Sequence, residues 1–271
     1  MTTPPPSGRA AAANGHEPTV LLETDGGVRR LVLNRPDRHN AQTAALWQEF
    51  AALGEQLTRD PDVRCVIVTG AGPSFSSGLD RTELQPGGLL TRIAEVGQSD
   101  VGAAEAMIAD IQRTFDWIRR APFPVIAAVH GAALGAGFEL ALACDLLMVA
   151  DDARLALPEV SMGVVPDLGS CHALRAALGY QHAMDLVLTG RALSGLEAAE
   201  LRLALQHHPH QQLDDAVMNY AQAVARSSPV ALRHAKRALL ETDDHASLTH
   251  AATGMVRGLN HVLTASPSPR P

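Results

Sequence analysis

Three short apolar runs, separated by segments of helical spacing, constrain the fold of this 271-residue chain more than any other feature. The runs are VRCVIVTG at 63–70, FPVIAAVHG at 123–131 and LLMVA at 146–150. Short runs that are apolar on both faces are typical of strands buried in a parallel sheet. Strands that alternate with helices imply right-handed crossovers. The sequence therefore predicts an α/β fold whose ligand site gathers at the ends of the strands.

Local patterns predict the elements around these runs. Alternating apolar residues on both sides of Asp25-Gly26-Gly27 indicate a β-hairpin, and residues 43–60 have the apolar spacing of a helix. We expect a further helix over about 104–120 and another that begins near Leu134.

The C-terminal part has a different pattern. From about Gly179 onward we expect helices only, with Ser194 capping one of them and Glu197 at capping-box spacing. Two further helices should follow, separated by a break near Ser227-Ser228-Pro229. The predicted organisation is a disordered tail at 1–17, an α/β core at 18–195, a helical region at 196–263 and a second tail at 264–271.

Composition excludes several classes of partner. The net charge of −7 argues against nucleic acid, and no apolar run reaches the roughly 20 residues of a membrane span. The first sixteen residues lack the apolar core of a signal peptide.

The three cysteines (Cys65, Cys144 and Cys171) are widely spaced, so we interpret them as buried thiols in a reducing compartment. We expect a cytoplasmic protein.

Three carboxylates lie in apolar surroundings and are candidate acid–base groups. Glu139 stands in the middle of GAALGAGFELALACD (131–145), which otherwise consists of small or apolar residues up to its final aspartate. A buried carboxylate usually has a raised pKa. Glu159 follows Pro158, and Asp167 follows Pro166, in the next apolar stretch. Carboxylates around one cavity can divide the acid and base roles, but the spacing alone leaves their convergence open.

Two glycine-rich turns, SSGLD at 76–80 and GAALGAG at 131–137, are the other candidate site. Glycine allows a ligand to approach the backbone, and two such turns could aim two N–H groups at one oxygen. The alternative is a pair of ordinary tight turns. Neither turn matches a P-loop or a dinucleotide fingerprint.

Histidines and basic residues give weaker signals. His207, His208 and His210 fall in a polar stretch without nearby cysteine, so a solvated loop is favoured over a zinc site and no metal is expected. His130 and His172 are interpreted as structural. Arg38 and His39 either contact a phosphate-bearing ligand or lie in a solvated turn.

Four segments in this order resemble the enoyl-CoA hydratase/isomerase, or crotonase, superfamily. They are LNRPDRHNA (33–41), FSSGLD (75–80), PVIAAVHGAALGAGFELALACDLLMVA (124–150) and LPEVSMGVVPDLG (157–169). The resemblance, which extends over about 18–245, implies repeated ββα units in a crotonase-like spiral. It also implies a C-terminal helical region that builds trimers, often paired into hexamers.

The same resemblance implies an acyl-CoA thioester substrate, with coenzyme A as part of the substrate and no separate cofactor. The thioester oxygen would lie between the N–H groups of Leu79 and Ala136, where the family often has glycine at the second position. The residues expected to line the substrate and its CoA moiety are Asp37, Arg38, His39, Ser77, Gly78, Asp80, Arg81, Thr82 and Gly135.

The activity expected first is hydration of a 2-enoyl-CoA, since Glu139 and Glu159 fall on the two glutamates of the family's hydratases. Asp167 supports an alternative, because the family's dienoyl-CoA isomerases have aspartate at that position. Such an isomerase would use Glu159 and Asp167 as the pair that moves the proton. A third alternative is a noncatalytic acyl-CoA-binding or RNA-binding member, and the net charge argues against RNA.

Overall fold

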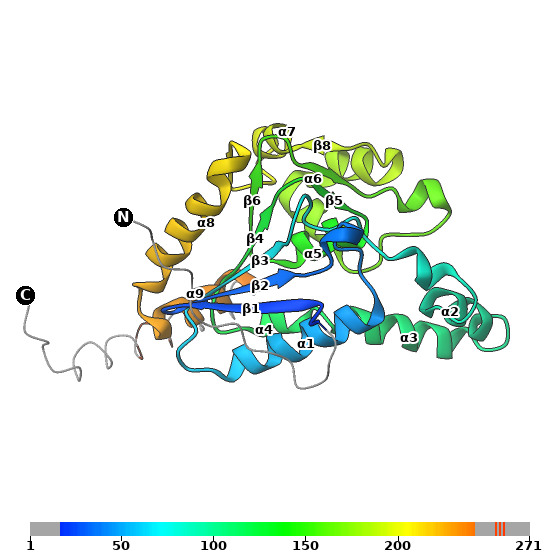
Figure 1. Cartoon of the computed structure of the whole chain (residues 1–271), viewed down its shortest axis with the longest axis horizontal. Coiled ribbons are helices and arrows are strands. Elements are labelled where there is room, and N and C mark those ends of the chain that lie inside the picture. Colours follow the sequence, from blue (N-terminus) through cyan, green and yellow to red (C-terminus); the bar gives the residue numbers. More distant parts are fainter. Residues whose placement is uncertain (1–16, 242–252, 254, 256, 258–271) are drawn as a thin grey trace, which may run out of the picture.

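The computed structural model describes residues 17–241 together with residues 253, 255 and 257 (Figure 1). The predicted tail at 264–271, all but the last residue of the tail at 1–17, and most of the chain after 241 lie outside the described residues. No described helix is long and apolar enough to cross a membrane.

A six-stranded sheet forms the centre of the fold, in the order β1-β2-β3-β4-β6-β9. Its strands are β1 (Val20–Asp25), β2 (Val28–Leu33), β3 (Cys65–Gly70), β4 (Val125–Val129), β6 (Leu146–Ala150) and β9 (Gln206–His208). Only β1 and β2 pair antiparallel, as the predicted hairpin, and every later pair is parallel. The three apolar runs therefore form the buried middle of the sheet, as their composition predicts.

A second, three-stranded sheet consists of β5 (Ala132–Leu134), β7 (Arg154–Ala156) and β8 (Leu193–Ser194). These strands correct two predictions. The chain at Leu134 is still a strand, and the helix expected there begins at Ala136. The part after Gly179 is not purely helical, because it contributes β8 to this sheet and β9 to the main sheet. The boundary predicted at 195 therefore cuts across the main sheet.

Nine α-helices have bounds within residues 17–241. They are α1 (Ala44–Arg59), α2 (Leu89–Gly97), α3 (Val101–Arg113), α4 (Asp116–Arg120), α5 (Ala136–Ala143), α6 (Ser170–Thr189), α7 (Gly195–Glu200), α8 (His210–Ala225) and α9 (Pro229–Leu240). The helix expected over 104–120 is in fact two, α3 and α4, interrupted at Thr114 and Phe115. Ser194 caps α7 as predicted, and its Oγ accepts the Glu197 N–H at 3.1 Å.

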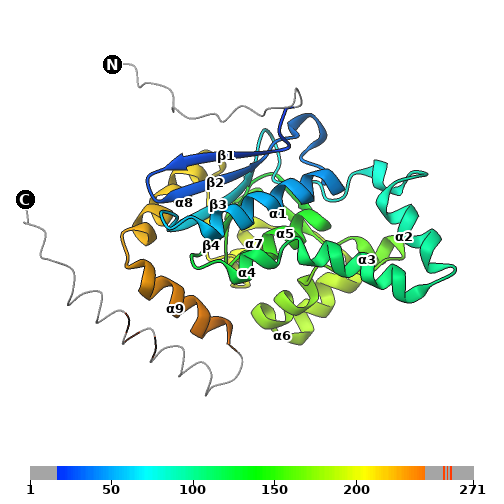
Figure 2. The same ribbon diagram turned by 90° about the horizontal axis from the view of Figure 1, so that it is seen from below.

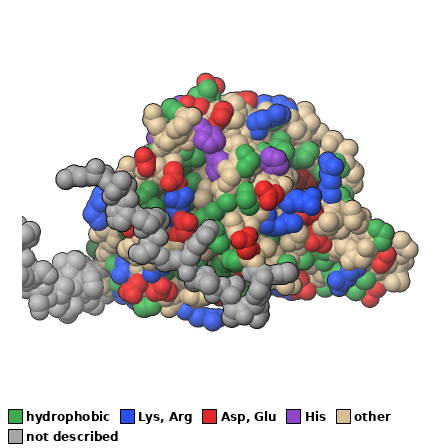
Figure 3. Space-filling model, viewed as in Figure 1, with side chains coloured by type: hydrophobic (Ala, Val, Ile, Leu, Met, Phe, Trp, Pro, Cys, Tyr) green, Lys and Arg blue, Asp and Glu red, His purple; other side chains and the backbone are tan. Residues whose placement is uncertain are grey.

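The helices cover the main sheet on both sides, with α8 on one side and α5 on the other (Figure 1). An aromatic cluster joins α1 to α4, where the rings of Phe50 and Trp117 lie 5.4 Å apart. Figure 2 shows that α9 lies to one side of the sheet and of the helices that cover it. The ammonium group of Lys236 fixes α9 to the core by an ion pair with Asp145 at 2.7 Å. Acidic and basic side chains are interspersed over the face seen in Figure 3.

Candidate active site

The two glycine-rich turns predicted from the sequence lie side by side. A β-bridge joins Ser76 to Ala133, and the Leu134 N–H donates to the Ser76 carbonyl at 3.0 Å. Gly78 has a φ of +91°, and a Cβ on it would lie 2.5 Å from the Leu134 carbonyl oxygen and 3.6 Å from the Ala136 nitrogen. Only glycine allows the two turns to come this close.

The N–H groups of Leu79 and Ala136 are both available to a ligand. The Gly78 carbonyl, on the same peptide as the Leu79 N–H, accepts from the Gln42 N–H at 2.7 Å. The Gly135 carbonyl, on the same peptide as the Ala136 N–H, accepts from the Glu139 N–H at 2.9 Å. A trans peptide points its N–H away from its carbonyl, so the Leu79 N–H faces away from Gln42 and the Ala136 N–H faces away from the Glu139 N–H. Neither finds an acceptor among the described residues, which leaves two donors of the kind that form an oxyanion hole.

Glu139 lies in the first turn of α5 and is 3% exposed. Its Oε1 accepts two hydrogen bonds, from the Leu168 N–H at 3.0 Å and from the Ser170 hydroxyl at 2.7 Å. Burial raises the pKa of Glu139 to about 7, although these two hydrogen bonds favour the charged form. Near neutral pH this carboxyl group can therefore both accept and donate a proton.

Glu159 begins the short 3-10 helix η3 (Glu159–Met162) and is 8% exposed. A Cβ on Gly135 would lie 2.8 Å from Glu159 Oε1, so this carboxylate lies against the peptide that carries the Ala136 N–H. Its Oε2 is buried and has no hydrogen-bond partner among the described residues. Burial raises the pKa of Glu159, and the charge of Asp167 adds to the rise. A buried oxygen without a partner is free to accept a hydrogen bond from a ligand or a water.

Asp167 is exposed, and its backbone carbonyl accepts from the Gln112 side chain at 2.8 Å. Partial burial of its carboxylate raises the pKa of Asp167. Its negative charge also raises the pKa of Glu139 and of Glu159, so it lies near both groups. The spacing left the convergence of the three carboxylates open, and in the structure their charges act on one another.

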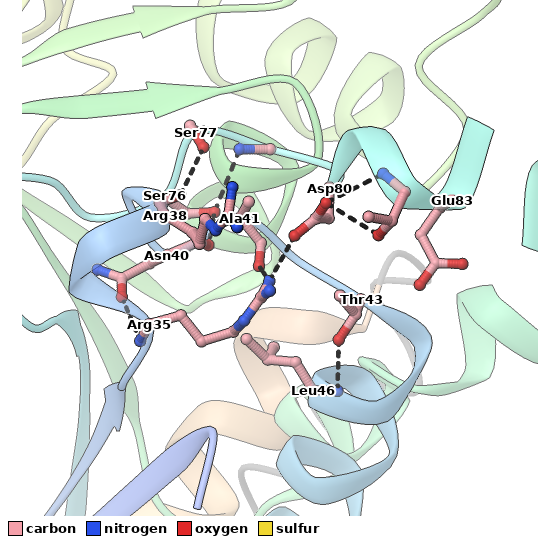
Figure 4. A network of polar contacts seen from close by, with 12 residues as sticks. Arg35, Arg38, Asn40, Ala41, Thr43, Leu46, Ser76, Ser77, Asp80 and Glu83 are labelled. Carbon is pink, nitrogen blue, oxygen red and sulfur yellow. Dashed lines mark hydrogen bonds and ion pairs between the residues drawn. The ribbon is translucent and has the colours of Figure 1, made fainter. Parts of the chain in front are cut away.

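The residues predicted to line the CoA moiety form two neighbouring turns (Figure 4). The first is the 3-10 helix η1 (Pro36–Arg38) with His39, and the second runs from Ser77 into the 3-10 helix η2 (Arg81–Leu84). The Ser77 hydroxyl donates to the Arg38 carbonyl at 3.4 Å and joins the two turns. The Arg38 and Arg81 side chains are exposed and make no ion pair with another described residue.

Asp80 differs from the other residues of this predicted set, because its carboxylate is already occupied (Figure 4). One oxygen pairs with Arg35 at 2.8 Å, and the other accepts from the Thr82 N–H and hydroxyl at 3.0 and 2.9 Å. Burial opposes the charge of Asp80, but the hydrogen bonds from Thr82 and Arg35 outweigh it and hold the pKa below its usual range. Asp80 therefore shapes the turn and does not offer a free carboxylate to a ligand.

Sequence reasoning missed three polar residues of this region. Asn40 bonds the Ala71 and Ser74 carbonyls, Ser170 bonds Glu139, and the buried side chain of Gln42 reaches Ala136. No local pattern marks these contacts, because the partners in them are 31 or more residues away along the chain.

The histidines and cysteines that the structure describes are spread over several parts of the fold. The described residues contain no group of three or more His, Cys, Asp or Glu side chains that could hold a metal ion. His207 and His208 lie in β9, which corrects the loop expected there, and His210 begins α8. The His210 ring lies 5.4 Å from that of His130. Cys171 is exposed, contrary to the buried thiol expected.

Comparisons with known proteins point to one family. The family model described as enoyl-CoA hydratase/isomerase matches residues 23–264. A protein of Mycobacterium tuberculosis named a probable enoyl-CoA hydratase is 35% identical over 221 residues, covering 82% of this chain and 80% of its own. The peroxisomal Delta(3,5)-Delta(2,4)-dienoyl-CoA isomerase of Arabidopsis thaliana is 33% identical over 249 residues, covering 90% of this chain and 86% of its own.

A solved structure extends the comparison to three dimensions. A protein of Thermobifida fusca YX, assigned as an enoyl-CoA hydratase and solved in complex with acetoacetyl-CoA, has a TM-score of 0.81 and 36% identity. The match covers 90% of this chain and 96% of that one. The same protein has also been solved in complex with CoA.

Proposed function

The chain belongs to the enoyl-CoA hydratase/isomerase family of enzymes, and we propose that it adds water to the double bond of a 2-enoyl-CoA thioester. One observation supports this most directly. Glu139 and Glu159 are both buried beside the paired N–H groups of Leu79 and Ala136, and one Glu159 oxygen has no partner among the described residues.

In the proposed reaction the thioester oxygen accepts hydrogen bonds from the Leu79 and Ala136 N–H groups. These donors stabilise the negative charge that develops on that oxygen as C3 is attacked. Glu139 and Glu159 hold the water between them. One carboxylate takes a proton from the water while the water oxygen bonds to C3. The other carboxyl group, which is protonated, gives its proton to C2. The product is a 3-hydroxyacyl-CoA, and the enzyme regains its protons when the two groups exchange with solvent.

A double-bond isomerase acting on a dienoyl-CoA is the second candidate, favoured by Asp167. Its charge lies close enough to Glu159 to raise the pKa of that carboxyl, so two groups are present to move a proton along a conjugated chain. Such a reaction removes a proton from one carbon and returns it to another without adding water. The Arabidopsis thaliana relative bears the name of this activity.

Absorbance assays with two substrates distinguish the candidates. Hydration removes the absorbance of the enoyl thioester and yields 3-hydroxyacyl-CoA. Isomerisation of a dienoyl-CoA whose double bonds are not conjugated with the thioester carbonyl produces a new long-wavelength band. Under hydration, Asp167→Asn should be mild, while Glu159→Gln should lower kcat by about 10²-fold or more. If Asp167→Asn is as damaging as Glu159→Gln on a dienoyl substrate, the isomerase is the correct assignment. Inactivity of the wild type on both substrates would refute both.

We also propose that the turns around Arg38 and Arg81 bind the CoA moiety, and that the protein needs no further cofactor. Their exposed guanidinium groups suit the phosphates of CoA. Binding of CoA alone, followed by calorimetry, should weaken at high salt and in Arg38→Ala. Binding that is indifferent to both changes would contradict the proposal.

Assembly into trimers or hexamers is proposed from the apolar surface of the C-terminal helices. Leu239 on α9 is 86% exposed, while Val230 and Leu232 are only half-buried. Association would cover these side chains. Light scattering should give a mass several times the 28.6 kDa of the chain, and a monomer at micromolar concentration would refute the proposal.

A further inference from the structure

Gln42 is fully buried and lies between the two turns that carry the N–H donors of the site. It precedes α1 and belongs to neither turn in the sequence. Polar side chains this deeply buried are retained only where hydrogen bonds satisfy them. The partners of Gln42 therefore indicate its role.

The backbone of Gln42 fixes the first donor. Its N–H donates to the Gly78 carbonyl at 2.7 Å, and its own carbonyl accepts from the Asp80 N–H at 2.8 Å. These two bonds hold the chain on both sides of Leu79. Because the Gly78 carbonyl and the Leu79 N–H belong to one planar peptide, fixing the carbonyl on one side aims the N–H to the other.

The side chain of Gln42 reaches the second donor. Its amide nitrogen donates to the Ala136 carbonyl and to the Ser76 hydroxyl, both at 3.2 Å. The Ser76 hydroxyl accepts in turn from the Gly78 N–H at 3.3 Å and donates to the Asn40 carbonyl at 2.8 Å. One amide group thus connects the residue that carries the second donor to the turn that carries the first.

Trp47 sets the orientation of this amide. Its indole N–H donates to the Gln42 side-chain oxygen at 2.6 Å. An indole nitrogen can only donate, so the amide oxygen must face Trp47 and the amide nitrogen must face Ser76 and Ala136. A residue without both a donor and an acceptor could not replace these contacts.

We propose that Gln42 is a positioning residue that holds the Leu79 and Ala136 N–H groups at the spacing and direction needed for one thioester oxygen. This inference rests on the proposed function, since it assumes that an acyl-CoA carbonyl binds there. Gln42 does not touch the substrate and acts only through the two turns. Its contribution belongs to the transition state, in which the charge on the oxygen is largest.

The test compares Gln42→Met with Thr43→Ala. Methionine has a similar length but no side-chain donor and only a weakly accepting sulfur, and the backbone bonds of residue 42 remain. Thr43 caps α1 through a 3.2 Å hydrogen bond from the Leu46 N–H (Figure 4), so Thr43→Ala loosens the same segment without touching either donor. With crotonyl-CoA as substrate, Gln42→Met should lower kcat about 10-fold and leave KM within about 2-fold. This loss in kcat is smaller than the roughly 10²–10³-fold loss from removing a whole oxyanion donor, because both N–H groups remain present. Thr43→Ala should lower the thermal midpoint but leave kcat unchanged.

A spectroscopic readout separates positioning from general loosening. Butyryl-CoA labelled with ¹³C at the carbonyl binds without reacting, and its infrared carbonyl band moves to lower frequency when two donors polarise it. We expect a downshift on the wild type and on Thr43→Ala, and a smaller or broader one on Gln42→Met. If Gln42→Met does not fold, Trp47→Phe removes the orienting donor and should produce a weaker change in the same direction.

The outcomes distinguish this inference from the proposed function. A wild type that shows neither turnover nor a carbonyl downshift refutes the acyl-CoA assignment and the inference with it. A wild type that shows a downshift, together with Gln42→Met of unchanged kcat and unchanged band, overturns only the role of Gln42. An equal loss in Gln42→Met and Thr43→Ala would likewise reduce Gln42 to a structural residue.

Discussion

Replacing Glu139 by glutamine should make the protein more stable and much less active. Burial raises the pKa of Glu139 from 4.5 to about 7 in the folded protein. The folded state therefore binds this proton more tightly than the unfolded state, and stability falls as the pH rises from 4.5 through 7. At about 1.4 kcal/mol per pKa unit, the charged carboxylate costs about 3 kcal/mol above pH 7. Glutamine carries no charge and keeps an oxygen for the Leu168 and Ser170 donors.

The assay is urea denaturation at about pH 8 and at about pH 4.5, with activity measured on the same samples. Glu139→Gln should gain about 3 kcal/mol at the higher pH and almost nothing at the lower one, while kcat falls by about 10²-fold. Glu105→Gln, on the exposed surface of α3, is the control and should change stability by less than about 0.5 kcal/mol at either pH. An equal gain at both pH values, or a loss at the higher one, would refute the reasoning.

Three further predictions follow from single contacts. Ser170→Ala removes a hydrogen bond to the Glu139 carboxylate, so the ionisation of Glu139 in the pH profile of kcat/KM should move about one to two pH units higher, whereas Ser170→Thr should leave it in place. Lys236→Met should lower the free energy of unfolding by about 3 kcal/mol in urea titrations because Asp145 is left charged, mostly buried and without its cationic partner, and adding Asp145→Asn should restore part of that loss. Gly135→Ala should abolish turnover but not CoA binding, since its φ is +51° and the new methyl group would meet Glu159 Oε1 at 2.8 Å; a fully active variant would contradict the assigned position of that carboxylate.

Local patterns predicted the long elements of the fold. The runs that became β3, β4 and β6 are apolar on both faces, and the hairpin and the Ser194 cap depend on residues within a few positions of each other. In contrast, β8 has two residues and β9 has three, too few to show any period. Their strand conformation depends on partners more than 35 residues away in β7 and β6, so only the assembled fold could reveal them.

The sequence likewise predicts only part of the candidate site, and tertiary contacts determine the rest. The glycines of the two turns and the three carboxylates could be chosen from the sequence, because their residue types suit the chemistry. The pKa of Glu139, about 7, results from a balance between burial, which favours the neutral form, and the Leu168 and Ser170 donors, which favour the charged form. Those donors lie 29 and 31 residues further along the chain, and the Ala136 carbonyl lies 94 residues from Gln42. Serine and glutamine are common on protein surfaces, so nothing in their identity predicts burial beside Glu139 or the two N–H donors. The residues that tune this site are therefore set by tertiary contacts, and a relative with the same glutamates but other neighbours would have a different pH dependence.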